Sequence, residues 1–215
     1  MPRYAAAIFD LDGTLIDTER LVIDAALVTL NARGFPVKRA FMASLVGIAE
    51  AEGHRRLCAH VGANIDYASF SAEWSVAIHA AYGTGIPLMT GVDILLADLA
   101  ARNMPRAVAT NSSTQGANRK MRLAGISDQF HHVVGFDLVP RPKPAPDVFL
   151  EAADRLGVNP ANCVAFEDSE TGVAAALAAG MVVVHVPDMA TPARHDAHHM
   201  AASILDGARA CGLIL

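Results

Sequence analysis

Short apolar runs alternate with helical stretches through the second half of the chain. The apolar runs cover residues 106–111, 132–136, 163–166 and 181–186. The helical stretches between them cover residues 114–124, 146–156 and 172–179. Gly157 and Gly180 stand just past the ends of two of these stretches, where glycine commonly ends a helix. Strands that alternate with helices of this length predict an α/β fold with a parallel sheet covered on both faces.

A further apolar run covers residues 5–9, and the segment between it and residue 86 has a different pattern. Residues 16–85 read as successive helices, the first of which ends near Gly34 with Pro36 beyond it. Two glycines and a proline in residues 82–87 are typical of a hinge. We therefore predict a core of residues 1–15 and 86–215 and an inserted helical cap of residues 16–85.

Composition narrows the class of protein. The chain has 215 residues, 53% of them hydrophobic and 18% charged, which is typical of a folded globular protein. The net charge of −5 and the lack of a basic stripe argue against nucleic acid as a partner. No apolar run reaches the roughly 18 residues of a membrane span, and Asp10 comes too early for a signal peptide. We expect a cytoplasmic protein with no membrane partner.

Polar residues follow the apolar runs, and in a parallel sheet these strand ends meet at one edge. Four carboxylates at one edge would repel each other unless a cation neutralised them, and oxygen-only ligands point to Mg²⁺. A lysine and exposed backbone amides beside them leave room for a dianion such as phosphate. The residues at this edge are Asp10, Asp12, Thr110, Asn111, Lys143, Glu167 and Asp168.

Four segments carry a resemblance to a known family. They read "FDLDGTLIDTE", "VATNSS", "RPKPAPDVF" and "FEDSETGVAAALAAGM", in this order over residues 5–187. In these segments the chain resembles the haloacid dehalogenase superfamily, in particular its phosphatase and phosphomutase branch with a small helical cap. The resemblance implies a Rossmann-like, doubly wound parallel sheet and catalysis through an aspartyl-phosphate.

The resemblance also implies roles for the two residues of the D-x-D pair. Asp10 resembles the nucleophile that attacks phosphorus, which divides one difficult displacement into two easier ones. Asp12 resembles the general acid that protonates the leaving alcohol and then the base that activates water.

The other motif residues resemble ligands of the metal and of the phosphoryl group. The implied Mg²⁺ ligands are Asp10, the backbone carbonyl of Asp12, Asp168, and Glu167 either directly or through water. Thr110, Asn111 and Lys143 would bind the phosphoryl oxygens, and Thr110 and Lys143 would also stabilise the transition state.

Within the family we expect a phosphatase that acts on a small phosphorylated metabolite, such as a sugar phosphate or phosphoglycolate. Asp12 disfavours a dehalogenase, which needs no acid for its leaving group. Lys38 is the only lysine of the cap and lies outside the loop where a phosphonatase would form its Schiff base.

Two alternatives stay open. One is a β-phosphoglucomutase-like enzyme, which has a cap histidine at the position where this chain has Val22. Such an enzyme also has cations around a cap glycine that corresponds to Gly47, whereas Val46 and Glu50 flank Gly47 in this chain. A catalytically silent binding module belongs to another class, and silent relatives usually lack a residue such as Asp10 or Asp168.

Several features are left without an assigned role. His195, His198 and His199 form a cluster within what reads as a closing helix, and a metal role for them is the less favoured interpretation. Arg55 and Arg56 on a cap helix are either solvated charges or substrate ligands. The oligomeric state is not set by the sequence, although a monomer would be sufficient.

Overall fold

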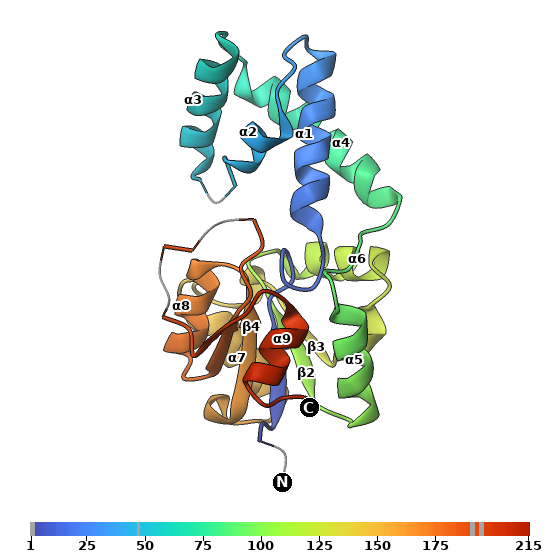
Figure 1. Cartoon of the computed structure of the whole chain (residues 1–215), viewed down its shortest axis with the longest axis vertical. Coiled ribbons are helices and arrows are strands. Elements are labelled where there is room, and N and C mark those ends of the chain that lie inside the picture. Colours follow the sequence, from blue (N-terminus) through green and yellow to red (C-terminus); the bar gives the residue numbers. More distant parts are fainter. Residues whose placement is uncertain (1–2, 47, 190–191, 194–195) are drawn as a thin grey trace. The chain divides into compact units, whose positions relative to one another are not determined.

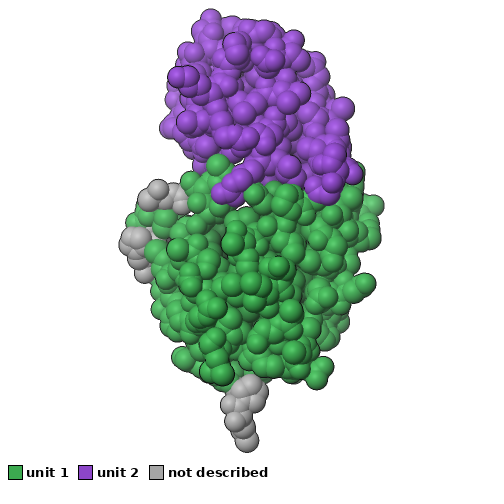
Figure 2. All heavy atoms as spheres, turned by 45° about the vertical axis from the view of Figure 1, so that its right-hand side comes forward, with its two compact units in different colours: residues 1–17, 86–215 green, residues 18–85 purple. Residues whose placement is uncertain are grey.

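The computed structural model describes residues 3–46, 48–189, 192–193 and 196–215 (Figure 1). The chain divides into two compact units (Figure 2). One consists of Met1–Asp17 together with Ile86–Leu215, and the other of Thr18–Gly85. The sequence placed the start of the helical unit at residue 16, two positions earlier. Gly47 of the cap loop and His195 of the histidine cluster lie outside the described residues.

The larger unit is built on a six-stranded sheet in the order β3-β2-β1-β4-β5-β6. All neighbouring strands are parallel, which confirms the predicted α/β fold. The strands are β1 Ala6–Phe9, β2 Arg106–Ala109, β3 His132–Val134, β4 Cys163–Glu167, β5 Val182–His185 and β6 His199–Met200.

Helices cover both faces of this sheet. They are α5 Val92–Ala101, α6 Thr114–Leu123, α7 Asp147–Arg155, α8 Glu170–Ala178 and α9 Ile204–Ala210. Three single turns of 3₁₀-helix accompany them, at Ser127–Gln129, Phe136–Leu138 and Pro160–Asn162.

Side chains alternate between the two faces, and each face packs against different helices. Val183 is buried in one cluster with Phe149 of α7 and Val173 of α8. Its neighbour Val184 points to the opposite face, where a Cβ added to Gly207 of α9 would lie 2.5 Å from its Cγ1. The two faces are therefore covered by α7 and α8 on one side and by α9 on the other.

The region of the histidine cluster corrects one expectation. A closing helix was expected there, but His199–Met200 forms β6 at the edge of the sheet, and α9 begins only at Ile204. The Nδ1 of His198 accepts a hydrogen bond of 3.1 Å from the Val183 amide. Pairing with the edge of β5 decides the conformation of this segment, and such pairing overrides local helix preference.

The smaller unit contains α1 Thr18–Ala32, α2 Arg39–Ala43, α3 Glu50–Val61 and α4 Tyr67–Gly83. The indole of Trp74 on α4 donates a hydrogen bond of 2.9 Å to the Val22 carbonyl on α1. Arg33 forms paired hydrogen bonds of 2.8 and 2.9 Å to the Glu73 carboxylate. These contacts, with Phe70 buried beside them, hold α1 against α4. None of the helices in the described part of the chain is long and apolar enough to cross a membrane.

The strand order reverses beside β1. β2 and β3 follow on one side of β1, and β4, β5 and β6 lie on the other. In an open α/β sheet such a reversal leaves a crevice at the carboxyl ends of the two central strands, and ligands bind there. The residues that follow β1 and those that end β4 therefore lie where the fold favours a site.

Candidate active site

Asp10 follows β1 directly and is nearly buried. Its amide donates a hydrogen bond of 2.9 Å to the Phe166 carbonyl, so the parallel pairing continues into the site. Lys143 Nζ lies 2.5 Å from Asp10 Oδ1 and 2.5 Å from Glu167 Oε1. The Lys143 side chain is only 3% exposed. One buried ammonium therefore joins the end of β1 to the end of β4.

Burial and charge act in opposite directions on this group. Burial raises the pKa of Asp10 to about 7, although Lys143 pulls it down, and the carboxylates of Glu167 and Asp12 add to the increase. Burial alone would lower the pKa of Lys143, but the Asp10 and Glu167 carboxylates together raise it above its ordinary value. Lys143 is therefore a permanent cation in the site.

Glu167 ends β4 and is completely buried. Its Oε2 accepts hydrogen bonds of 3.3 Å from the Ser169 amide and 3.1 Å from the Ser169 hydroxyl. A Cβ placed on Gly172 in α8 would lie 1.8 Å from Glu167 Oε1. Only glycine at position 172 leaves space for this carboxylate, so α8 and Glu167 are fitted to each other.

Asp168 lies against the turn that follows β1. The Thr14 hydroxyl donates a hydrogen bond of 3.3 Å to Asp168 Oδ1. Gly13 has φ +82°, and a Cβ there would lie 2.4 Å from Asp168 Oδ2. Glycine is required at position 13 both by the left-handed backbone and by this close approach. The Asp168 carbonyl is bonded to the Nε2 of the buried His185 at 2.9 Å.

Three of these acids could hold one cation. An oxygen from each of Asp10, Glu167 and Asp168 lies within 4.8 Å of the others. Of the described residues, this is the one group of three or more acids, histidines or cysteines with that geometry. An all-oxygen donor set of this kind fits a hard divalent cation such as Mg²⁺. His198 and His199 belong to no such group among the described residues.

The end of β2 supplies polar groups beside Asp10. Thr110 is buried, and its Oγ1 accepts a hydrogen bond of 3.0 Å from the Ser112 amide. The side chain of Asn111 forms hydrogen bonds with the backbone of Lys143. Its Oδ1 accepts from the Lys143 amide at 2.9 Å, and its Nδ2 donates to the Lys143 carbonyl at 3.2 Å. Asn111 therefore positions Lys143 in this structure.

Asp12 has two partners that the sequence analysis did not single out. The Ser112 hydroxyl donates a hydrogen bond of 2.9 Å to Asp12 Oδ2. The ammonium of Lys120 on α6 contacts the same carboxylate oxygen and lies 2.8 Å from the Ser112 Oγ. The one sequence feature that could have drawn attention to Lys120 is the rarity of lysine, since the chain contains only Lys38, Lys120 and Lys143.

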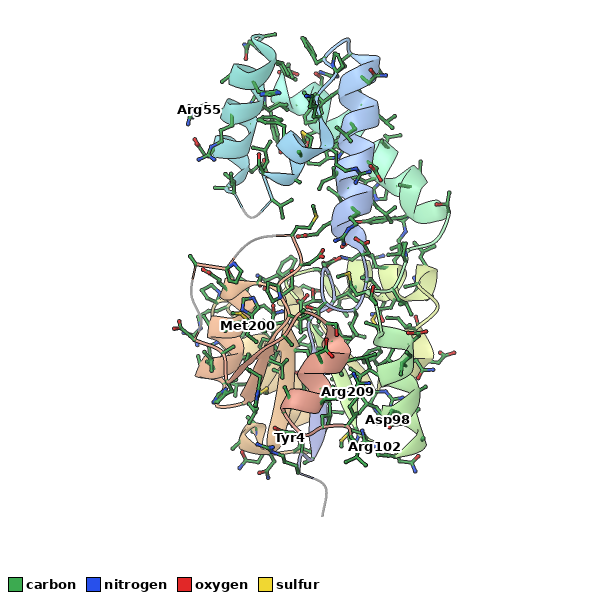
Figure 3. The ribbon with its side chains drawn as sticks, viewed as in Figure 1. Tyr4, Arg55, Asp98, Arg102, Met200 and Arg209 are labelled. Atoms are coloured by element: carbon green, nitrogen blue, oxygen red, sulfur yellow. The ribbon has the colours of Figure 1, made fainter. Side chains whose placement is uncertain are left out.

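Arg55 and Arg56 of the helical unit pair with an acid on their own helix. Arg55 and Arg56 bind Glu52 on α3 at 2.7 and 2.6 Å. Hydrogen bonds from Arg55 and Arg56 lower the pKa of Glu52 to about 2. The Arg55 side chain is 70% exposed and projects outward from α3 (Figure 3).

Comparison with protein families and curated proteins gives consistent matches. A family model described as haloacid dehalogenase-like hydrolase matches residues 7–186. The chain is 34% identical over 184 residues to fructose-1-phosphate phosphatase YqaB of Escherichia coli strain K12, which covers 86% of this chain and 97% of that protein. It is 33% identical over 190 residues to β-phosphoglucomutase of Bacillus subtilis strain 168, which covers 84% of this chain and 82% of that protein.

A solved structure extends the likeness to the whole chain. A HAD family hydrolase from Deinococcus radiodurans R1, with bound phosphate and sodium, superposes with a TM-score of 0.85 at 28% identity. The match covers 99% of this chain and 97% of that one. The sheet with its inserted helical unit is therefore a fold shared with hydrolases of this kind.

Proposed function

The chain belongs to the haloacid dehalogenase-like hydrolase family, and we propose that it cleaves a small phosphate monoester through an aspartyl-phosphate on Asp10. It is a phosphoric monoester hydrolase. The observation that carries the proposal is the position of Asp10 at the switch point of the sheet, 2.5 Å from the Lys143 ammonium. Asp12 follows two residues later, and Asp168 lies beside the same turn.

The first half of the proposed reaction transfers the phosphoryl group to the protein. A carboxylate oxygen of Asp10 attacks phosphorus, and the bond between phosphorus and the alcohol oxygen breaks. Asp12 gives its proton to that oxygen, so that the alcohol leaves neutral. Thr110 and Lys143 bind the phosphoryl oxygens and stabilise their charge.

The second half returns the enzyme to its starting state. Asp12, now ionised, accepts a proton from a water molecule as that water attacks phosphorus. The bond between phosphorus and Asp10 breaks, and inorganic phosphate is released. The net reaction consumes one water and one phosphate ester, and it yields one alcohol and one phosphate. Asp12 therefore ends the cycle protonated, as it began.

A divalent cation completes the site. We assign Mg²⁺ to Asp10, Asp168 and Glu167, whose oxygens form the donor set described above. The family resemblance adds the backbone carbonyl of Asp12 as a fourth ligand. Bound Mg²⁺ would supply positive charge that offsets the repulsion among the carboxylates and the phosphate. Glu167 also binds Lys143 and Ser169, so it has a structural role in addition to its proposed role as a ligand of the cation.

The proposed substrate is a sugar phosphate or a similarly small metabolite such as phosphoglycolate. The similarity to fructose-1-phosphate phosphatase supports this class. The similarity to β-phosphoglucomutase supports a phosphomutase as the second candidate. Val22 argues against the mutase, because a β-phosphoglucomutase-like enzyme has a histidine at the corresponding position of its cap.

A panel of phosphorylated metabolites tests the proposal. The protein is incubated with each compound and Mg²⁺, and free phosphate is measured before and after addition of a chelator. We expect release from at least one compound, loss of release with the chelator, and loss with Asp10→Asn. Release that Asp10→Asn leaves unchanged would overturn the mechanism. Conversion of β-glucose 1-phosphate to glucose 6-phosphate without free phosphate would establish the mutase instead.

We also propose that the protein works in the cytoplasm. Cys58, Cys163 and Cys211 are all unpaired thiols, and two of them are buried. Unpaired cysteines are usual in a reducing compartment, which supports this location.

A further inference from the structure

Lys120 occupies an unusual environment for a lysine near the end of a helix. It lies in the last turn of α6, where a lysine ordinarily extends into solvent. Instead, its side chain is 13% exposed, and its ammonium contacts the Asp12 carboxylate and the Ser112 hydroxyl. Side chains of a helix lean toward its N-terminus, and here that direction leads back to the loop after β2.

The three groups contact one another pairwise. Ser112 Oγ donates to Asp12 Oδ2 at 2.9 Å, and Lys120 Nζ contacts both of these oxygens. The Asp12 side chain itself is 30% exposed. Two of the three lysines in the chain thus lie in this site, with Lys143 on Asp10 and Lys120 on Asp12.

The base of this cluster is held by other contacts. The Ser112 amide donates to Thr110 Oγ1, and the Ser112 carbonyl accepts from the Phe136 amide at 3.2 Å. The first residue of α6, Thr114, donates from both its amide and its hydroxyl to Asp137 Oδ1, at 2.6 and 2.9 Å. The helix that carries Lys120 and the loop that carries Ser112 are therefore fixed relative to Thr110.

We propose that Lys120 is a positioning residue for Asp12. With Ser112, it holds the Asp12 carboxylate in one orientation toward the oxygen of the leaving alcohol. This inference rests on the proposed function, since it assigns Asp12 the proton transfer. Lys120 touches neither the phosphoryl group nor the attacking oxygen in this scheme, so its loss weakens proton transfer and leaves nucleophilic attack by Asp10 in place.

Leaving groups that differ in their need for a proton test the proposal. The probes are phenyl phosphate and 4-nitrophenyl phosphate, which share a ring and differ in the nitro group. Phenolate is the more basic leaving group and depends more on an acid. We expect Lys120→Met to lower kcat/KM for phenyl phosphate by about tenfold or more beyond its effect on 4-nitrophenyl phosphate, which is part of the roughly 10²–10⁴-fold that a general acid contributes in full. Equal losses on the two esters would overturn the proposal.

A matched variant and a second substitution keep the test independent of folding. Arg122→Met removes a cation from the same turn of α6, where Arg122 is exposed, and should leave both rates unchanged. Lys120→Gln keeps a polar side chain of similar length, and its thermal midpoint is compared with that of the wild type. Should Lys120→Met unfold, the same selective loss is expected of Lys120→Gln, and an unselective loss there counts against the proposal.

A double-mutant cycle then asks whether Lys120 acts through Asp12. In an Asp12→Asn background, the further change Lys120→Met should have almost no effect on kcat/KM for phenyl phosphate, because the residue it positions is gone. A full additional loss in that background would overturn the proposal. Turnover by an Asp10→Asn variant at the wild-type rate would instead overturn the proposed function itself. The two proposals therefore fail in distinguishable ways.

Discussion

Lys143 Nζ lies 2.5 Å from Asp10 Oδ1, although 133 positions separate the two residues in the chain. The same ammonium lies 2.5 Å from Glu167 Oε1. All three side chains are buried or nearly so. Burying two carboxylates is costly unless a cation and hydrogen bonds compensate for their lost hydration. Lys143 therefore stabilises the site as well as serving the proposed chemistry.

Replacing Lys143 should cost considerable stability. In Lys143→Met, Asp10 and Glu167 are left as uncompensated buried acids, and breaking such a pair typically costs about 3–5 kcal/mol. The free energy of unfolding is measured in urea without added Mg²⁺. The double variant Lys143→Met with Glu167→Gln removes one of the stranded charges and should recover part of the loss. A double variant no more stable than the single one would contradict this account.

Gly172→Ala should destabilise the protein, because the new Cβ collides with Glu167 at 1.8 Å. Overpacking of this kind typically costs about 1–3 kcal/mol. The matched control is Gly53→Ala on α3, where nothing lies within 4 Å of the new Cβ. There the change should stabilise by about 0.5–1 kcal/mol, since alanine favours a helix interior. Thermal unfolding of both variants checks the opposite signs.

Stability should fall in mildly alkaline solution because of Cys163. Burial raises the pKa of this thiol from 9.0 to about 11. As the pH rises, the Cys163 thiol therefore loses its proton in the unfolded chain before it does so in the folded protein. The contribution of this thiol to stability is fully present below pH 9 and is lost as the pH rises to about 11. The slope of the unfolding free energy between pH 9 and 11 is compared in wild type and Cys163→Ala. We expect a shallower slope in the variant, and identical slopes would be evidence against the shift.

Mg²⁺ should raise the thermal midpoint of the protein. A cation that binds only the folded state stabilises it by RT ln(1 + [L]/Kd), or about 2.7 kcal/mol at a hundredfold excess over Kd. Asp168→Asn removes one proposed ligand and should abolish most of this increase. Asp154→Asn on the exposed side of α7 is the control and should keep it. An undiminished increase in Asp168→Asn would exclude Asp168 as a ligand.

Much of the site follows from local pattern. Apolar runs followed by polar residues predict parallel strands, and parallel strands place their carboxyl ends together. The sequence alone therefore assigns Asp10, Thr110 and Glu167 to one edge of one sheet. The helix α5 was not predicted, because its apolar residues are nearly continuous and show little periodicity.

Contacts between distant segments could not be read in this way. The strand β6 forms only because the edge of β5 offers hydrogen bonds, so its own residues do not indicate it. Asn111 was among the expected phosphate ligands. In the fold, its side chain also forms a hydrogen bond with the backbone of Lys143, 32 positions away. Residues that far apart meet through tertiary packing, which periodicity does not encode.

The sequence by itself determined the parallel sheet, the inserted helices and the acids at the strand ends, because these depend on hydrophobic period and on short motifs. Only the tertiary structure decided which cation accompanies which acid. Lys120 reads as an ordinary lysine in the last turn of a helix, and it contacts Asp12, 108 positions away, because α6 packs against β3 of the same sheet. Charge pairing depends on distances of a few ångströms, and those are set by how the elements pack.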